Sequence, residues 1–465
     1  MINFFIVPIK NFNRGESMST ERQESKLIRS LGFMDLMGIA VGQIIGAGIM
    51  SSTGIAIGMT GTGVVLAFLI SPLLSILSIY PVAILGSAVP TTGGPYRYTS
   101  RLLGKSCGMI YLLLHVTTNV MIAVFALSFA SYFVSIVTGC NQHIVAMIVL
   151  TFFYMVNLIG TKQTARLNTI MTFFLIGGLL LFIAFGLGKA DITYIMNPKN
   201  LFPKGTMAFI STLALLSSAT SGAQVVAELG GEVKNAGSVI PKVIIASTFG
   251  VGIFYVLIAI VAAGVLPIDV VANQPLTFVA KETMPMIAFY LFVIGAALGA
   301  TATTLNATLS WVTKPLLVAC DDGMLPKTFG TVSSKGVPYK LLTFFYIIGM
   351  IPLLMGLDLA FVAKFTTANS LLSKIFFCLS LYVLASKNKE IIEKSTLKIS
   401  ASKAKLYSVI AIIVLCVLSS SLLMNLSSKV IIFISVLVVI SLIYTKVVTK
   451  NVVIENDLNM DYTTK

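Results

Sequence analysis

Residues 42–49 read GQIIGAGI and place Gly42, Gly46 and Gly48 within an apolar run that extends from Phe33 to Met59. Glycine lets the backbone leave helical geometry and lets another group approach it closely. Within a bilayer, the amides and carbonyls freed by a break are tolerated only where they line a cavity or bind something. Close helix packing through small residues is the alternative interpretation. We favour a helix that is broken inside the membrane.

The composition of the chain requires lipid as its main solvent. Of 465 residues, 57% are apolar and 11% are charged, and the mean hydropathy is +0.96. A soluble domain of this kind would expose large apolar patches. The net charge of +15 is not arranged as a basic stripe with interleaved aromatics, so we expect no nucleic-acid partner.

The cysteines predict neither a disulfide framework nor a metal cluster. They are odd in number and scattered, and most lie inside apolar runs: Cys107, Cys140, Cys320, Cys378 and Cys416. We expect them to behave as small hydrophobic side chains. No metal, cofactor or catalytic residue is predicted.

Apolar runs long enough for a helical span, about 20 residues, occur twelve times. They cover Phe33–Met59, Gly61–Val89, Gly108–Thr138, Ile144–Gly160, Leu167–Leu187, Met207–Leu229, Val243–Leu266, Met286–Val312, Leu341–Leu357, Leu359–Ala385, Leu406–Leu426 and Val430–Tyr444. Barrel strands would alternate over about ten residues, which these runs do not do. The sequence predicts an all-α integral membrane protein.

The basic residues predict its orientation, because cytoplasmic loops carry the excess of Lys and Arg. Alternate loops divide the 32 basic residues into 25 on the side of the N-terminus and six on the other, with Lys374 alone inside a helix. We expect both termini in the cytoplasm, and residues 1–30 and 447–465 to be cytoplasmic tails. The apolar start, MINFFIVPI, is too short for a span and lacks a cleavage site.

The sixth run contains a second candidate break. Ser217–Gly222 reads SSATSG in mid-span, and Gln224, Glu228 and Glu232 follow it. Interrupted helices at corresponding places in two halves of a chain are the best sequence pointer to a substrate site between inverted repeats. Amides at the N-terminus of a half-helix bind a carboxylate, and carbonyls at a C-terminal end bind an ammonium. A zwitterion is the expected ligand.

Four stretches together resemble the amino acid–polyamine–organocation (APC) transporters, from about Leu31 to Tyr444. They are GQIIGAGI (42–49), PTTGGPYRY (90–98), SGAQVVAELGGEVKNAGSVIPK (221–242) and CDDGMLPKTF (320–329). The resemblance implies a leucine-transporter-like fold in which helices 1 and 6 are broken. Its inverted repeats of five helices would cover residues 31–190 and 205–386, with two extra helices in 404–446.

The resemblance also implies which residues bind substrate. Gly46, Ala47 and Gly48 look like the positions whose amides hold the α-carboxylate, Asn119 like a substrate-binding asparagine, and Gly222 like the helix 6 glycine. The full candidate set is Gln43, Ile44, Gly46, Ala47, Gly48, Asn119, Ser218, Ser221, Gly222 and Thr308. Relatives that exchange arginine for agmatine have two tryptophans and a glutamate where this chain has Ser218, Thr308 and Gln224. This departure argues against arginine and agmatine.

Candidates for gating or coupling are Tyr111, Gln224, Glu228 and Lys374. A charge at the depth of Lys374 is costly and is a functional candidate by default; snorkelling to the interface is the alternative. For Glu228 and Glu232 we favour an ion pair with nearby Lys234 and Lys242 over a substrate contact. The lysine that some proton-coupled relatives carry in helix 5 falls near Leu175.

The sequence therefore predicts a secondary transporter of a neutral amino acid in a cytoplasmic membrane, with bacterial features in its short termini and loops. Exchange and proton-coupled symport both stay open, as does the oligomeric state. The alternatives are a basic amino acid or polyamine antiporter, and a nutrient sensor on the same fold. A membrane enzyme would need paired carboxylates or a histidine-rich metal site at membrane depth, which two histidines and few acids do not supply.

Overall fold

The computed structural model describes residues 29–137, 139–356, 359–423 and 428–447, together with residues 449, 450, 452 and 454. Residues 1–28 and 455–465 of the predicted tails lie outside this part of the chain, as do the side chains of Ala47 and Ser218. Among the described residues the structure is helical, with isolated bridges pairing Leu31 with Val233 and Thr92 with Leu229.

Helices lie on each of the first five apolar runs. They are α2 (Phe33–Ile44) with α3 (Ala47–Thr60), α4 (Val64–Ala88), α6 (Lys105–Thr118) with α7 (Met121–Ile136), α8 (Gln142–Ile159) and α9 (Thr161–Leu187). The third run is divided because the chain turns at Asn119 and Val120. The helix α8 begins where the side chain of Asn141 accepts from the amides of His143 and Ile144, which satisfies two free donors of its first turn.

The later runs are helical as well. They form α12 (Gly205–Ala219), α13 (Ala236–Gly264), α16 (Met286–Phe292) with α17 (Gly299–Trp311), α19 (Tyr339–Leu354), α20 (Leu359–Lys387), α22 (Ala401–Leu423) and α23 (Ser428–Val447). A π-helical segment, η5 (Val293–Leu298), joins α16 to α17.

The predicted C-terminal end of the sixth helix is wrong by more than two helical turns. The sixth run was expected to be helical to Leu229, but α12 ends at Ala219 and the chain continues in the 3₁₀ segments η3 (Ala223–Glu228) and η4 (Gly230–Glu232). Glycine is the reason, because Gly222 has a φ of 149°, which a side chain would strain. The following helix, α13, then begins seven residues before the predicted Val243.

Eight helical stretches are long and apolar enough to cross a membrane. They are Phe33–Met50, Ser52–Ala88, Lys105–Val134, Gln142–Ile159, Thr161–Leu187, Ala236–Gly264, Met286–Asp321 and Asn369–Lys387. Large apolar side chains face outward from the bundle, among them Phe152, Phe174 and Ile253, which are 57%, 69% and 65% exposed. The chain is an all-helical, multi-pass membrane protein.

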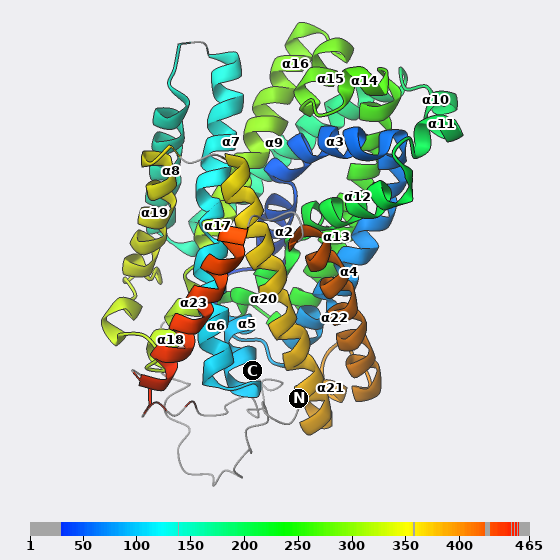
Figure 1. Cartoon of the computed structure of the whole chain (residues 1–465). Coiled ribbons are helices and arrows are strands. Elements are labelled where there is room, and N and C mark those ends of the chain that lie inside the picture. Colours follow the sequence, from blue (N-terminus) through cyan, green and yellow to red (C-terminus); the bar gives the residue numbers. More distant parts are fainter. Residues whose placement is uncertain are drawn as a thin grey trace.

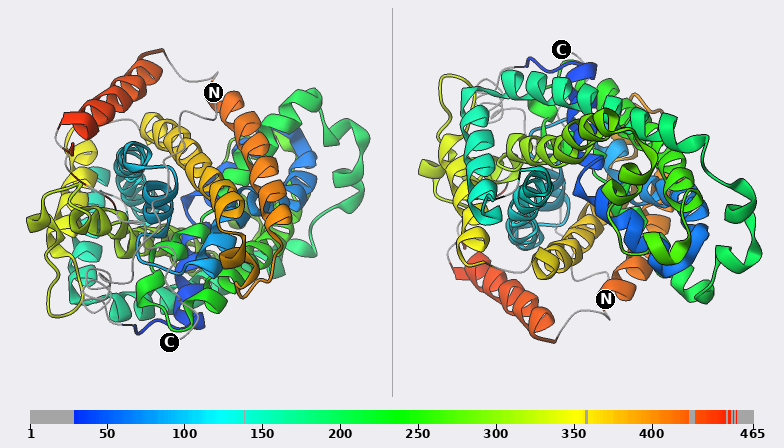
Figure 2. Two further views of the ribbon diagram at one scale, coloured as in Figure 1. Left: turned by 90° about the horizontal axis from the view of Figure 1, so that it is seen from below. Right: turned by 90° about the horizontal axis from the view of Figure 1, so that it is seen from above.

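The loops divide between two ends of the bundle (Figure 1). One end carries the short helices α5 (Gly94–Leu102), α18 (Lys314–Asp321) and α21 (Lys389–Glu393), and the other carries α10 (Ile192–Met196), α11 (Pro198–Leu201), α14 (Ile268–Val271) and α15 (Leu276–Thr283). The first group lies in loops that the charge count assigns to the cytoplasm, and the second in loops that it assigns to the opposite face. Seen along the bundle, α23 lies at its periphery (Figure 2).

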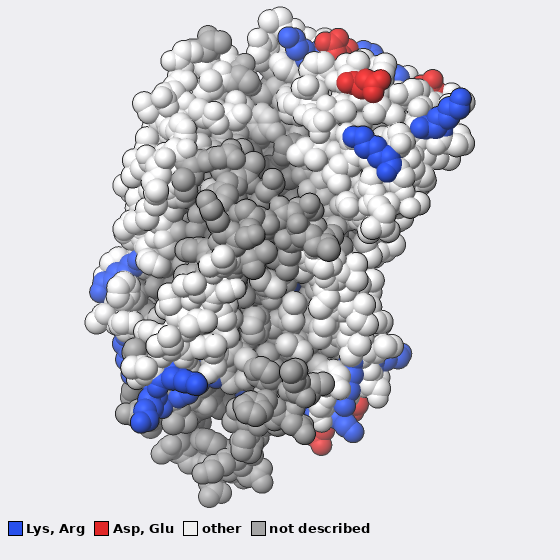
Figure 3. Space-filling model, viewed as in Figure 1, with Lys and Arg blue, Asp and Glu red and all other residues white. Residues whose placement is uncertain are grey.

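Charged side chains follow the same division. On the face drawn in Figure 3, the described Lys, Arg, Asp and Glu residues gather toward the two ends, and an uncharged belt separates them. Inside the bundle, α2 packs against α9, α13 and α17, while α20 packs against α4, α6 and α22. The two interrupted helices meet where α3 packs against α12 and α2 packs against η3.

Candidate functional site

The first interruption lies between α2 and α3, at Ile45 and Gly46. The amide of Ile45 donates to the carbonyl of Val41 and closes α2, and Gly46 is then extended, with φ −111° and ψ −159°. A Cβ atom at Gly46 would lie 2.6 Å from Oγ1 of Thr304 in α17. The break therefore fits against α17 only because residue 46 has no side chain.

The second interruption follows α12. The side chain of Gln224 folds back so that its Oε1 accepts from the amide of Gly222 at 3.0 Å. On the other side, Ser75 of α4 donates to the carbonyl of Ser217 at 2.7 Å. These contacts satisfy backbone groups that a continuous helix would have paired internally.

The two interruptions meet, although they are far apart in the sequence. A Cβ atom at Gly222 would lie 3.0 Å from the carbonyl oxygen of Gln43 and 3.3 Å from the amide nitrogen of Ile44, and one at Gly48 would lie 3.6 Å from Cβ of Ala219. The structure thus brings together the glycines selected from both breaks.

Hydrogen bonds from α17 and α13 hold the first break in place. Oε1 of Gln43 accepts from Oγ1 of Thr308 and from Nε1 of Trp311, both at 3.2 Å. The hydroxyl of Tyr255 donates to the carbonyl of Ile44 at 3.0 Å. Trp311 and Tyr255 are absent from the predicted set. The sequence could have indicated Trp311 as a site residue. It is the only tryptophan of the chain, and it lies three residues after Thr308 on the same helical face.

The polar groups at the breaks are partly reachable by solvent. Gln43, Gly48, Ala219, Ser221 and Gln224 are half-buried, whereas their flanking residues along the chain are mostly buried. Polar groups deep in a bundle stay hydrated only where they border a cavity. Both breaks therefore include residues that are less buried than their neighbours along the chain.

Lys374 points into the same region from α20. Its ammonium donates to Oγ of Ser221 at 3.0 Å, and the residue is 4% exposed. Of the two interpretations of this lysine, snorkelling to the interface is contradicted, because the side chain is buried against the break after α12.

The expected ion pairs of Glu228 and Glu232 with Lys234 and Lys242 do not form; both lysines are exposed. Oε1 of Glu228 instead accepts from the hydroxyl of Tyr111 at 3.2 Å, and the carboxylate is buried. Glu232 forms an ion pair with Lys314, and each of these two side chains is 1% exposed. The prediction used proximity in sequence, but packing of distant helices decided the partners.

Asn119 directly follows the last residue of α6. Its Nδ2 donates to the carbonyl of His115 at 2.7 Å, where α6 ends. Nε2 of His115 lies 2.8 Å from the carbonyl oxygen of Val312, so this histidine links α6 to the end of α17. Asn119 thus lies at the kink of the third run, and its contact with a substrate stays a prediction.

A sequence model of a protein family matches most of the chain and identifies its family. The model described as "Amino acid permease" matches residues 31–453, which include both interruptions. The chain belongs to the amino acid permease family. As a member of this family it is a membrane transporter and not an enzyme, and its interrupted helices lie in the matched region.

Several curated relatives of this permease are transporters. The branched-chain amino acid permease BcaP of Bacillus subtilis is 28% identical over 79% of this chain and 83% of its own length. The methylthioribose transporter of the same organism is 26% identical over 68% of this chain and 72% of its own length. The serine/threonine exchanger SteT of Bacillus subtilis is 24% identical over 51% of this chain and 55% of its own length. The chain is an amino acid transporter by family.

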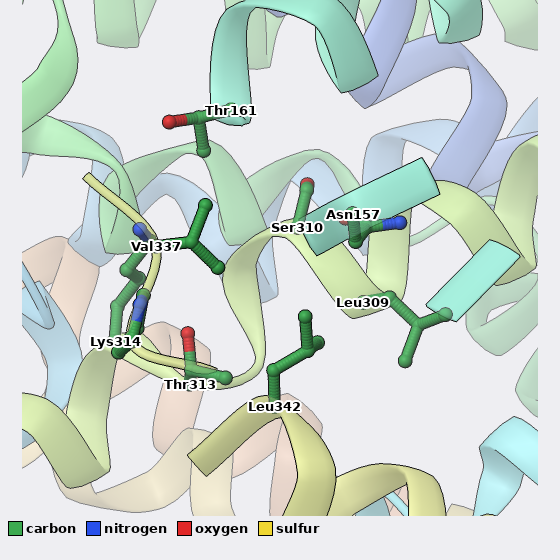
Figure 4. A pocket seen from close by; sticks show the side chains of 9 residues that line it. Asn157, Thr161, Leu309, Ser310, Thr313, Lys314, Val337 and Leu342 are labelled. Carbon is green, nitrogen blue, oxygen red and sulfur yellow. The ribbon is translucent and has the colours of Figure 1, made fainter. Parts of the chain in front are cut away.

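A small pocket of this permease lies away from the interruptions, among α8, α9, α17, α18 and α19 (Figure 4). Its lining includes Asn157, Thr313 and Lys314, and none of the predicted site residues. Because Lys314 is paired with Glu232, we assign this pocket to the packing around that ion pair.

Proposed function

We propose that this chain is a secondary transporter that moves a neutral amino acid across the cytoplasmic membrane by alternating access. The observation that carries the proposal is the contact between the two interruptions, where Gly222 lies against the backbone of Gln43 and Ile44. Half-helix ends that face one another near mid-membrane suit a zwitterion, because they offer free amides to a carboxylate and carbonyls to an ammonium.

In this proposal the substrate carboxylate binds the amides of Ala47 and Gly48 at the N-terminus of α3, and that of Gly46 in exchange for its hydrogen bond to the carbonyl of Ile44. The ammonium binds carbonyls at the C-terminal ends of α2 and α12. Ser221 and Thr308 border the space for the substrate side chain. Gln43 positions the first break through Thr308 and Trp311.

A neutral side chain is favoured over a cationic one. Positions Ser218, Gln224 and Thr308 supply neither an aromatic clamp nor an acid for a distal amine. The branched-chain permease and the serine/threonine exchanger, whose names refer to neutral amino acids, support this choice.

For the fold we propose twelve spans with both termini in the cytoplasm. The inverted repeats cover residues 31–190 and 205–386, and two further helices cover 404–446. The division of the loops between two ends (Figure 1) supports this arrangement, as does the excess of basic residues in the loops of one end.

The first test is thermal stabilisation of the purified protein by each of the twenty amino acids and by common polyamines, since a ligand of the folded state raises its stability. Stabilisation by neutral amino acids supports the proposal. Stabilisation only by lysine, ornithine or putrescine overturns the choice of substrate.

Reconstitution in liposomes then separates the mechanisms. Uptake of a labelled neutral amino acid that requires an amino acid inside the liposomes indicates exchange, and uptake into liposomes without internal amino acid that requires an inward proton gradient indicates symport. Binding without either flux identifies a sensor and overturns the transporter proposal.

A further inference from the structure

The ammonium of Lys374 is buried in the bundle next to the second interruption. Its hydrogen bond to Ser221, at 3.0 Å, ties α20 to this segment. Within the part of the chain that the structure describes, buried ion pairs such as that of Lys314 with Glu232 join other residues. The ammonium of Lys374 contacts the neutral hydroxyl of Ser221 instead.

The surroundings of the Lys374 ammonium stabilise one positive charge but disfavour a second cation close to it. Ser221 lies two residues beyond the last residue of α12, where the dipole of a 15-residue helix is negative. A first cation placed there gains from the dipole. A second cation brought close to it gains less and is repelled by the first, because charges interact strongly where water is largely excluded.

The same ammonium lies beside the meeting point of the two breaks. Its partner, Ser221, directly precedes Gly222, and Gly222 lies against the backbone of Gln43 and Ile44. Ser221 is half-buried, so a solute that reaches the breaks also reaches the neighbourhood of Lys374.

We propose that Lys374 is a specificity-determining residue, a fixed positive charge in the wall of the substrate site that excludes substrates with a cationic side chain. This inference rests on the proposed function and adds the residue that selects by charge. It works by repulsion of the wrong substrate, in addition to any attraction for the right one. A merely structural role, in which the amine only ties α20 to the break, would change stability without changing the ratio between substrates.

The test compares lysine with leucine and serine as labelled substrates in proteoliposomes. Two variants neutralise the site independently: Lys374→Met removes the charge, and Ser221→Asp places a carboxylate at the ammonium. Lys374→Arg keeps the charge. Lys387→Met is the matched control, because it makes the same change on an exposed lysine of α20.

The expected result is a rise of about tenfold or more in the ratio of lysine to leucine or serine uptake in Lys374→Met and in Ser221→Asp. Lys374→Arg and Lys387→Met should keep the ratio of the unmodified protein. The use of two neutralising variants keeps the test decisive if one of them fails to fold.

Two results would overturn the inference while the transporter stands. One is efficient lysine uptake by the unmodified protein, and the other is an unchanged ratio in every neutralising variant that folds. A folded, unmodified protein that moves none of the three amino acids refutes the proposed function, and the inference falls with it.

Discussion

Gly222 lies against the backbone of Gln43, so closely that an added Cβ atom would be 3.0 Å from the carbonyl oxygen of Gln43. Gly222 also has a φ of 149°, which a residue with a Cβ atom adopts only under strain. The contact between the two interruptions therefore depends on the absence of a side chain at residue 222.

Gly222→Ala should lower transport by at least about tenfold and the free energy of unfolding by about 1–3 kcal/mol, because strain at such a position is of that order. Uptake in proteoliposomes and thermal unfolding of the purified protein measure the two effects. Gly250→Ala is the control, because a Cβ atom at Gly250 of α13 meets nothing within 4 Å. Uptake at the unmodified rate by Gly222→Ala would refute a close contact of the breaks during transport.

Substitutions at Gly48 should have graded effects. A Cβ atom there would lie at an ordinary contact distance from Ala219, 3.6 Å, so Gly48→Ala should keep the fold and part of the activity. Gly48→Leu should abolish ligand-induced thermal stabilisation, because its larger side chain would fill the space beside the first turn of α3. Gly177→Leu, at an open position of α9, should bind normally. Unchanged binding and transport by Gly48→Leu would rule out substrate binding at the first break.

Substitutions of Tyr111 and Glu228, which share a hydrogen bond, should have different effects. The first should lower stability, and the second should test proton coupling. Tyr111→Phe removes a donor from a buried carboxylate and should destabilise the protein by about 1–3 kcal/mol. Glu228→Gln keeps an acceptor for Tyr111 and should fold. If Glu228 carries the coupled proton, Glu228→Gln loses the response of uptake to a pH gradient but retains counterflow. The exposed Glu282→Gln is the control, and a pH response that survives in Glu228→Gln excludes Glu228 as the proton site.

The ion pair of Glu232 and Lys314 should be costly to break from either side. Glu232→Gln or Lys314→Met leaves one uncompensated buried charge and should lower the free energy of unfolding by about 3–5 kcal/mol. Replacing both residues, as Glu232→Gln with Lys314→Met, should recover part of this loss. The exposed pair of Glu390 and Lys394 is the matched control, and Glu390→Gln should not measurably change the melting temperature. Equal melting temperatures for Glu232→Gln and Glu390→Gln would show that the first pair is hydrated.

Features that depend on local chemistry could be predicted from the amino-acid sequence. Apolar runs predict helices because a buried backbone must satisfy its own hydrogen bonds. The break at Gly222 follows from the conformational freedom of glycine, and the break at Gly46 from the close approach that a missing side chain permits. The helical class, the approximate helix positions and the sites of interruption were therefore predictable, although the end of α12 was placed too late.

Only the tertiary structure decided which side chains meet. Lys374 reaches Ser221, Glu228 reaches Tyr111, and Glu232 pairs with Lys314 rather than with Lys234, two residues away. The identity of each partner depends on how distant helices pack and turn, and the hydrophobic pattern of one helix does not encode that. A charge in a membrane protein binds whatever polar group packing brings to its depth, because water is scarce there.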